Sequence, residues 1–132
     1  MNKRVADRKI RDTFFTGNKG ANVIEETIKQ IEARIQSADS LTPERRKELA
    51  ELLTTLKAET SELAKTHGEQ AQSIVGFAQV TTHEATRAEQ DPRLLDLSLE
   101  ALRSSVHDFE KSHPRLAQIV NTISTTLSNS GI

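Results

Sequence analysis

The sequence predicts an all-α protein, built as a long antiparallel helical hairpin or coiled-coil-like bundle with a short helix before it. Apolar residues recur at steps of three and four along most of the chain, which is the spacing of one helical face. Each of the three prolines follows residues that favour the start of a helix, where proline is well tolerated. The 132 residues include only five glycines, and Ala, Leu, Ile, Glu, Lys and Arg are abundant, as in long helices.

The distribution of charge divides the chain into a basic N-terminal extension, residues 1–20, and a helical bundle domain, residues 21–132. The extension has six Lys or Arg and two Asp, a net charge of +4, whereas the whole chain has a net charge of −1. Ala6, Ile10 and Phe14 would lie on one helical stripe. Two interpretations stay open: a basic arm that contacts an anionic membrane surface or nucleic acid, or a mobile or partner-packed extension.

The first helix of the bundle domain is predicted over residues 21–38. Asp39 and Ser40 then interrupt the pattern. Because isoleucine occupies both seam positions of the heptad and little of the chain is left to cover them, this seam favours dimers or higher assemblies. The seam consists of Ala21, Ile24, Ile28, Ile31, Ile35 and Ala38.

The second helix is predicted to begin at Pro43, because Thr42 is a favourable N-cap worth about 1 kcal/mol. The step from Leu63 to Ile74 is eleven residues, the offset of an inserted half-turn in a coiled coil. Gly68 either separates two helices or lies within one long, weakened helix over residues 43–89, and we expect the single helix. The seam runs through Leu49, Leu52, Leu56 and Leu63, then Ala71, Ile74, Ala78 and Ala85.

The third helix is predicted to begin at Pro92, after the N-cap Asp91. Its seam passes Pro114 without a change of phase, which predicts a helix kinked there or two nearly collinear helices, and no sharp reversal. A helix over residues 92–128 would be about 55 Å long, at about 1.5 Å per residue. It would be too long for a globule with a radius of gyration of about 14 Å. A second long helix must therefore lie beside it.

We predict that this last seam is the contact surface of a homo-oligomer, with a dimer favoured. After Arg115 the chain carries no charged side chain, and depletion of charge is typical of interface cores. The alternative for this uncharged stretch is a solvated polar face. The predicted interface residues are Leu95, Leu99, Leu102, Val106, Phe109, Leu116, Val120, Ile123 and Leu127.

The four histidines give only weak indications of chemistry. Glu110 and His113 have the Glu-x-x-His spacing of di-iron bundles, but those sites need a second copy of the motif and further glutamates. His83-Glu84 lacks the second histidine of a zinc-protease motif. No histidine has a convincing nucleophile and orienting acid. We therefore expect no catalytic residues, no metal, no cofactor and no small-molecule substrate.

The composition excludes several other classes of protein. Without cysteine the chain forms no disulfide and no thiolate site, which is compatible with a reducing cytoplasm. The net charge of −1 creates no field that attracts the whole protein to nucleic acid or membranes. The longest apolar runs are only a few residues, and the N-terminus lacks a hydrophobic region of secretory length. We expect a cytoplasmic protein without a transmembrane helix.

Two segments resemble a family of short, uncharacterised bacterial helical proteins, known as a domain of unknown function. The stretch from Phe109 to Leu116, FEKSHPRL, followed by LSNSGI at Leu127 to Ile132, is similar to the end of that family. ADSLTPER at residues 38–45 is similar to its front half. The resemblance implies a small bacterial helical protein and carries no activity, ligand or catalytic residue with it.

The expected function is that of a structural or interaction protein of unknown cellular role, which self-associates through helical heptad seams. The alternative is a protein that contacts a membrane surface or nucleic acid through residues 1–20.

Overall fold

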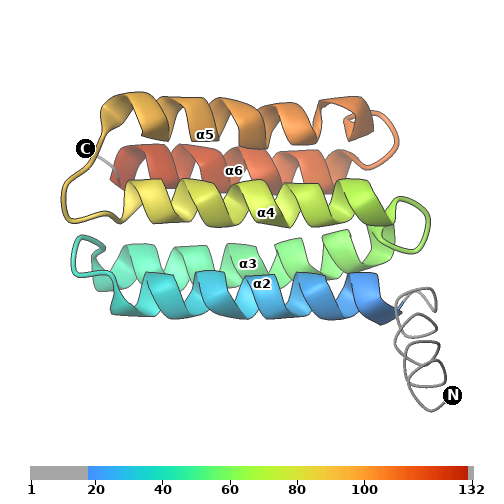
Figure 1. The fold of residues 1–132 in the computed structure, drawn as a ribbon, viewed down its shortest axis with the longest axis horizontal. Helices are drawn as coiled ribbons and strands as arrows, with labels where there is room; N and C mark the ends of the chain where they lie inside the picture. Colours follow the sequence, from blue (N-terminus) through green and yellow to red (C-terminus); the bar gives the residue numbers. More distant parts are fainter. Residues whose placement is uncertain (1–17, 131–132) are drawn as a thin grey trace, which may run out of the picture.

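The computed structural model describes residues 18–130, which form five α-helices and no β-strand (Figure 1). The prediction of an all-α protein is confirmed. The first helix is not short, because it has 20 residues against 21 in the next one. The helices are α2 (Asn18–Ser37), α3 (Pro43–Leu63), α4 (Gly68–Ala85), α5 (Pro92–Ser105) and α6 (Pro114–Ser130), and a short 3₁₀ helix, η1 (His107–Phe109), follows α5.

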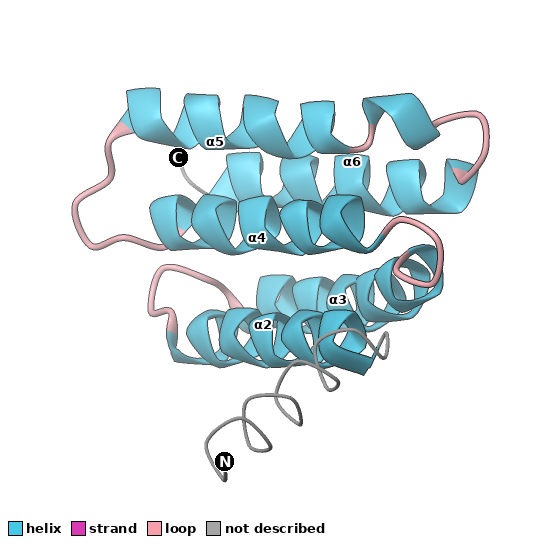
Figure 2. Ribbon diagram, turned by 45° about the vertical axis from the view of Figure 1, so that its right-hand side comes forward, coloured by secondary structure: helices cyan, strands magenta, loops and turns pink. Residues whose placement is uncertain are grey.

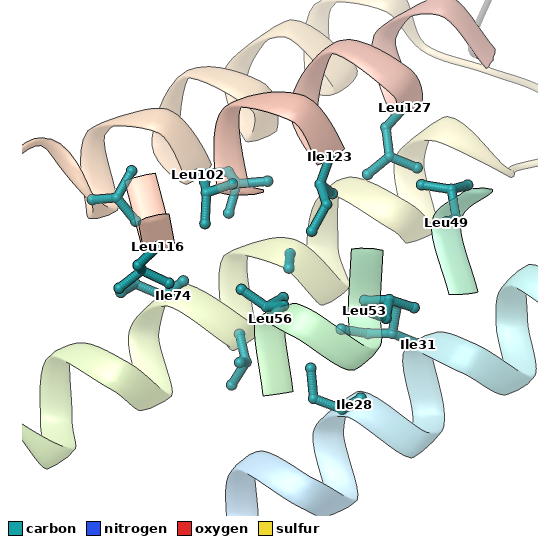
Figure 3. Close-up of a cluster of buried hydrophobic side chains, with 14 of the residues drawn as sticks. Ile28, Ile31, Leu49, Leu53, Leu56, Ile74, Leu102, Leu116, Ile123 and Leu127 are labelled. Carbon is teal, nitrogen blue, oxygen red and sulfur yellow. The ribbon is translucent and has the colours of Figure 1, made fainter. Parts of the chain in front are cut away.

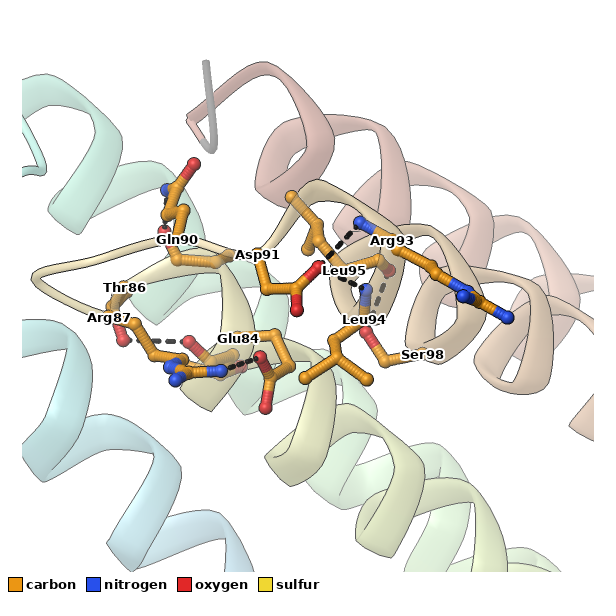
Figure 4. Close-up of polar contacts among 11 residues, drawn as sticks. Glu84, Thr86, Arg87, Gln90, Asp91, Arg93, Leu94, Leu95 and Ser98 are labelled. Carbon is orange, nitrogen blue, oxygen red and sulfur yellow. Dashed lines mark hydrogen bonds and ion pairs between the residues drawn. The ribbon is translucent and has the colours of Figure 1, made fainter.

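Two helices begin at the predicted caps. The Thr42 hydroxyl accepts a hydrogen bond from the backbone N–H of Arg45 at 3.1 Å, at the start of α3. The Asp91 carboxylate accepts from the backbone N–H groups of Arg93 and Leu94 at 3.0 and 3.3 Å (Figure 4). These side chains satisfy N–H groups that have no partner within the helix. Local sequence therefore determines where α3 and α5 begin.

Each helix runs antiparallel to the one before it, and the five lie in two layers (Figures 1 and 2). One layer contains α2, α4 and α5 in that order, and the other contains α3 and α6. α3 packs against α2 and α4, α6 packs against α4 and α5, and α3 and α6 also pack against each other. α4 is the central helix because it contacts all four of the others.

The central position of α4 explains its composition. Neighbouring helix axes lie about 8–10 Å apart, so a helix surrounded on several sides needs small side chains at its contacts. The buried face of α4 includes Ala71, Ala78 and Ala85 together with the hydroxyl residues Thr81 and Thr82. The thin apolar pattern of this segment thus reflects several close neighbours and not a weak seam.

A single hydrophobic core lies between the two layers (Figure 3). All five helices contribute to it, and α2 buries its isoleucine seam there. Ile28 is only 1% exposed, and Leu56, Ile74 and Leu116 are fully buried. The four isoleucines of the first predicted seam are therefore covered by the same chain.

The structure differs from the long helix predicted over residues 43–89. α3 ends at Leu63, and the backbone leaves helical conformation at His67, with φ −135° and ψ 63°. α4 then begins at Gly68 and runs back antiparallel to α3. The step of eleven residues from Leu63 to Ile74 arises because two separate helices need not share one phase.

The structure also differs from the continuous seam predicted through Pro114. α5 ends at Ser105, and the chain turns back through η1 so that α6 packs antiparallel against α5 (Figure 1). Val106 and Phe109 are buried at this turn and continue the apolar spacing without a continuous helix. The reversal folds both halves of the stripe onto one core, so no helix of about 55 Å needs a long neighbour.

Candidate interaction surface

The predicted interface residues are all part of the core of the single chain. Each is at most 8% exposed, and Leu102, Leu116 and Leu127 are fully buried. Their burial needs no second chain. A contact between copies must therefore use other side chains than Leu95, Leu99, Leu102, Val106, Phe109, Leu116, Val120, Ile123 and Leu127.

Six uncharged residues of α6 outside the seam are exposed in the single chain, whereas Ser124 and Thr126 are buried. The six exposed residues line a shallow groove of about 660 Å³ beside α3, together with Glu48 and Glu110. The hydroxyls of Thr122 and Thr125 donate to the backbone carbonyls four residues before them, at 2.9 and 3.0 Å. Hydroxyls bonded in this way can still accept a hydrogen bond but have no further hydrogen to donate to a ligand. The exposed groove residues of α6 are Pro114, Gln118, Asn121, Thr122, Thr125 and Asn129.

A second surface, on α4 and α5, is apolar. Among the described residues, four large apolar side chains are exposed: Phe77 at 39%, Val80 at 50%, Leu94 at 42% and Leu97 at 53%. We refer to these four residues as the α4/α5 surface. The heptad pattern does not predict this surface, because these residues lie outside the seams.

The contact between α4 and α5 places the four side chains along one side of this helix pair, with Val80 and Leu97 at nearly the same level. The Thr81 hydroxyl donates to the backbone carbonyl of Ser98 at 3.0 Å, and both residues are buried. Phe77 and Val80 precede Thr81 by four residues and one residue, and Leu94 and Leu97 precede Ser98 by the same two steps. At 3.6 residues per turn, both pairs border the contact from its solvent side.

A hollow of about 360 Å³ places Phe77, but none of the other three residues, beside the neighbouring helix. It is lined by Phe77 and Ser73 of α4 and by Ser104 and Ser105 of α5. Phe77 therefore faces the neighbouring helix. Scattered single apolar residues need no explanation, but a contiguous apolar patch on a protein surface often marks a site of interaction.

Charged groups surround the α4/α5 surface. Arg93 and Glu100 are exposed on α5, seven residues apart and so on the same flank of that helix. On α4, Arg87 donates to Glu84 at 2.8 Å (Figure 4). The hydrogen bond and the charge of Glu84 raise the pKa of Arg87, which stays protonated at any physiological pH. An apolar centre with a charged rim is the usual arrangement of protein interfaces.

The Glu-x-x-His pair lies in the turn between α5 and α6 and not on one helical face. Glu110 Oε1 lies 3.2 Å from Nδ1 of His107, whereas the His113 ring packs edge-on against Phe109, with 5.7 Å between ring centroids. His67 packs against the same Phe109 ring at 5.4 Å. Within residues 18–130 no group of three His, Asp or Glu side chains is placed to hold a metal ion.

A polar hollow of about 420 Å³ lies beside the C-terminal ends of α2 and α4. Arg34 donates to Thr86 Oγ1 at 2.8 Å there, and Arg87 and Asp39 also line it. Both arginines lie near helix C-termini, whose free carbonyl groups attract cations. Arg87 is paired with Glu84, and Asp39 adds a negative charge to the lining, so the hollow does not resemble a site for an anion.

Comparison with protein-family models, with curated proteins and with solved structures finds no match to this chain. No described helix is both long enough and apolar enough to cross a membrane. The helical stripe of Ala6, Ile10 and Phe14, predicted within the basic extension, lies outside the described residues.

Proposed function

We propose that the protein is a structural or interaction protein without catalytic activity, which self-associates through the α4/α5 surface. The observation that carries this proposal is the exposure of Phe77, Val80, Leu94 and Leu97 on two neighbouring helices, since among the described residues these are the four large apolar side chains that are exposed. A dimer is the favoured assembly, because pairs are the commonest symmetric oligomers.

The proposal keeps the self-association that the heptad seams predict and assigns it to a different surface. The absence of cysteine supports a cytoplasmic location as part of it. Membership of the uncharacterised bacterial helical family stays a prediction, and that family would add no activity.

The test is sedimentation equilibrium of the wild type and of the double variant Val80→Ser, Leu97→Ser. Both side chains are at least half exposed, so the substitutions should change the stability of the fold by less than about 1 kcal/mol in total. Their loss from an interface should weaken dimerisation at least about tenfold, since burying one leucine side chain contributes about 1.5–3 kcal/mol.

The matched control is the double variant Thr122→Asp, Thr125→Asp on the exposed face of α6. It should dimerise like the wild type. If it alone prevents dimerisation, the uncharged face of α6 is the interface and the assignment to α4/α5 is wrong. A wild-type chain that stays monomeric up to hundreds of micromolar would overturn self-association itself.

A second candidate function is contact with a membrane surface or nucleic acid through residues 1–20. The charge of +4 favours it and would contribute about 4 kcal/mol near an anionic surface, at about 1 kcal/mol per charge. Such a contact is only about millimolar unless several copies act together. Co-sedimentation with anionic vesicles or duplex DNA should then be lost when residues 1–20 are deleted, and unchanged binding would rule this function out.

A further inference from the structure

Arg93 and Glu100 indicate how two copies would meet. We infer that two α5 helices pack antiparallel about a two-fold axis that passes beside Leu97. This inference rests on the proposed self-association and adds the orientation and register of the two copies.

The register follows from residue spacing. In an antiparallel pair centred on Leu97, a residue four positions before the centre is level with the residue four positions after it in the second copy. Arg93 is therefore level with Ala101 of the second copy, and Glu100 of that copy is one residue away, or about 1.5 Å along the axis. Opposite charges thus meet at both ends of the contact.

The two charges also lie on the correct side of the helix. Arg93 and Glu100 are seven residues apart, nearly two full turns, so they share one flank of α5. A two-fold axis perpendicular to the helices places the same flanks of both copies next to each other. The arrangement therefore forms two equivalent Arg93–Glu100 pairs, each between different chains.

Side-chain size supports the same register. The two Leu97 side chains meet at the axis, whereas Leu94 lies within one residue of Ala101 of the second copy. Ala101 is half-buried and small, so it leaves room for a leucine between the helices, as when a knob enters a hole. In a parallel pair, Arg93 would instead be level with Arg93 of the second copy and about 10 Å along the axis from its Glu100, so the two ion pairs could not form.

The arrangement has a consequence for the whole assembly. Because the copies run in opposite directions, the first residues of their α2 helices lie at opposite ends of the dimer. The layer of α3 and α6 faces away from the contact, since the α4/α5 surface is exposed to solvent whereas the opposite faces of α4 and α5 are buried in the core between the layers. The dimer would therefore present the same groove of α6 on two opposite faces.

Charge reversal tests this geometry. Arg93→Glu and Glu100→Arg should each weaken dimerisation about tenfold, because each replaces two exposed ion pairs with two pairs of like charge. An equimolar mixture of the two variants should dimerise about as tightly as the wild type, since opposite charges then meet at both ends. Arg103→Glu, on the other side of α5, is the control and should have no effect.

A single cysteine provides the second test, because the chain has none of its own. Leu97→Cys should oxidise to a covalent dimer within minutes under mild oxidant, whereas Thr122→Cys should stay monomeric over the same time. If the mixture of charge variants does not recover and Leu97→Cys does not cross-link, the antiparallel geometry is overturned. The proposed function would still stand if Val80→Ser, Leu97→Ser weakened the dimer, and it would fail if that variant dimerised like the wild type.

Discussion

Two leucines of α5 have opposite surroundings. Leu102 is fully buried in the core, whereas Leu97 is 53% exposed on the α4/α5 surface. The difference arises because Leu102 lies four residues after Ser98, on the side of the contact with α4 that faces the core. The position of each leucine on the helix, and not its residue type, therefore decides whether its side chain is buried or exposed.

Leu102→Ala should destabilise the protein by about 2–5 kcal/mol, because it removes buried methyl groups and leaves a cavity. Chemical denaturation of a dilute, monomeric sample measures this cost. Leu97→Ala is the matched control and should change the free energy of unfolding by no more than about 0.5 kcal/mol. Equal costs for the two variants would contradict the assignment of Leu102 to the core and Leu97 to the surface.

At the scale of single helices, Pro114 is compatible with two arrangements: a continuous helix kinked at the proline, or a new helix that begins with it. The structure places it first in α6, where its missing N–H is not needed. The first hydrogen bond of α6 runs instead from the N–H of Ala117 to the carbonyl of His113, at 3.2 Å. Proline here begins a helix and does not interrupt one.

Pro114→Ala distinguishes the two arrangements. In a continuous helix, removal of an interior proline would stabilise the protein by about 3 kcal/mol. At the first position of α6, the substitution should instead cost up to about 1 kcal/mol, because alanine leaves the unfolded chain more freedom. Thermal unfolding followed by circular dichroism gives the sign, and a clear gain in stability would contradict the reversal at Pro114.

At the scale of the whole molecule, α4 joins the two halves of the bundle. It packs against α2 and α3 on one side and against α5 and α6 on the other, so all the buried apolar side chains belong to one core. A small domain with one core is expected to unfold in a single cooperative transition.

Native-state hydrogen exchange tests this cooperativity. The slowest amides of α2, α4 and α6 should open with free energies that agree within about 1 kcal/mol, because global unfolding limits all three. Amides near the helix ends provide an internal control and should exchange faster. If α2 opens well before α6, the bundle consists of two weakly coupled units.

The sequence by itself determined the helical class and the starts of α3 and α5. It also indicated many of the apolar residues that are buried, and all nine predicted interface residues lie in the core. These properties depend on neighbours within one or two turns: a cap needs only the next three residues, and a helical face needs only the spacing of its side chains. Such information is local, so it can be read from the chain directly.

Only the tertiary structure decided where the chain reverses and therefore which chain covers the seam. Apolar residues at steps of three and four show which face of each helix is buried, but not which helix packs against that face. A second copy of the chain and a later helix of the same chain could each bury it equally well. The spacing continued through Val106 and Phe109 although the helix did not. The exposure of Leu97 likewise followed from the pairing of α4 with α5, a contact between segments whose side-by-side placement no local pattern specifies.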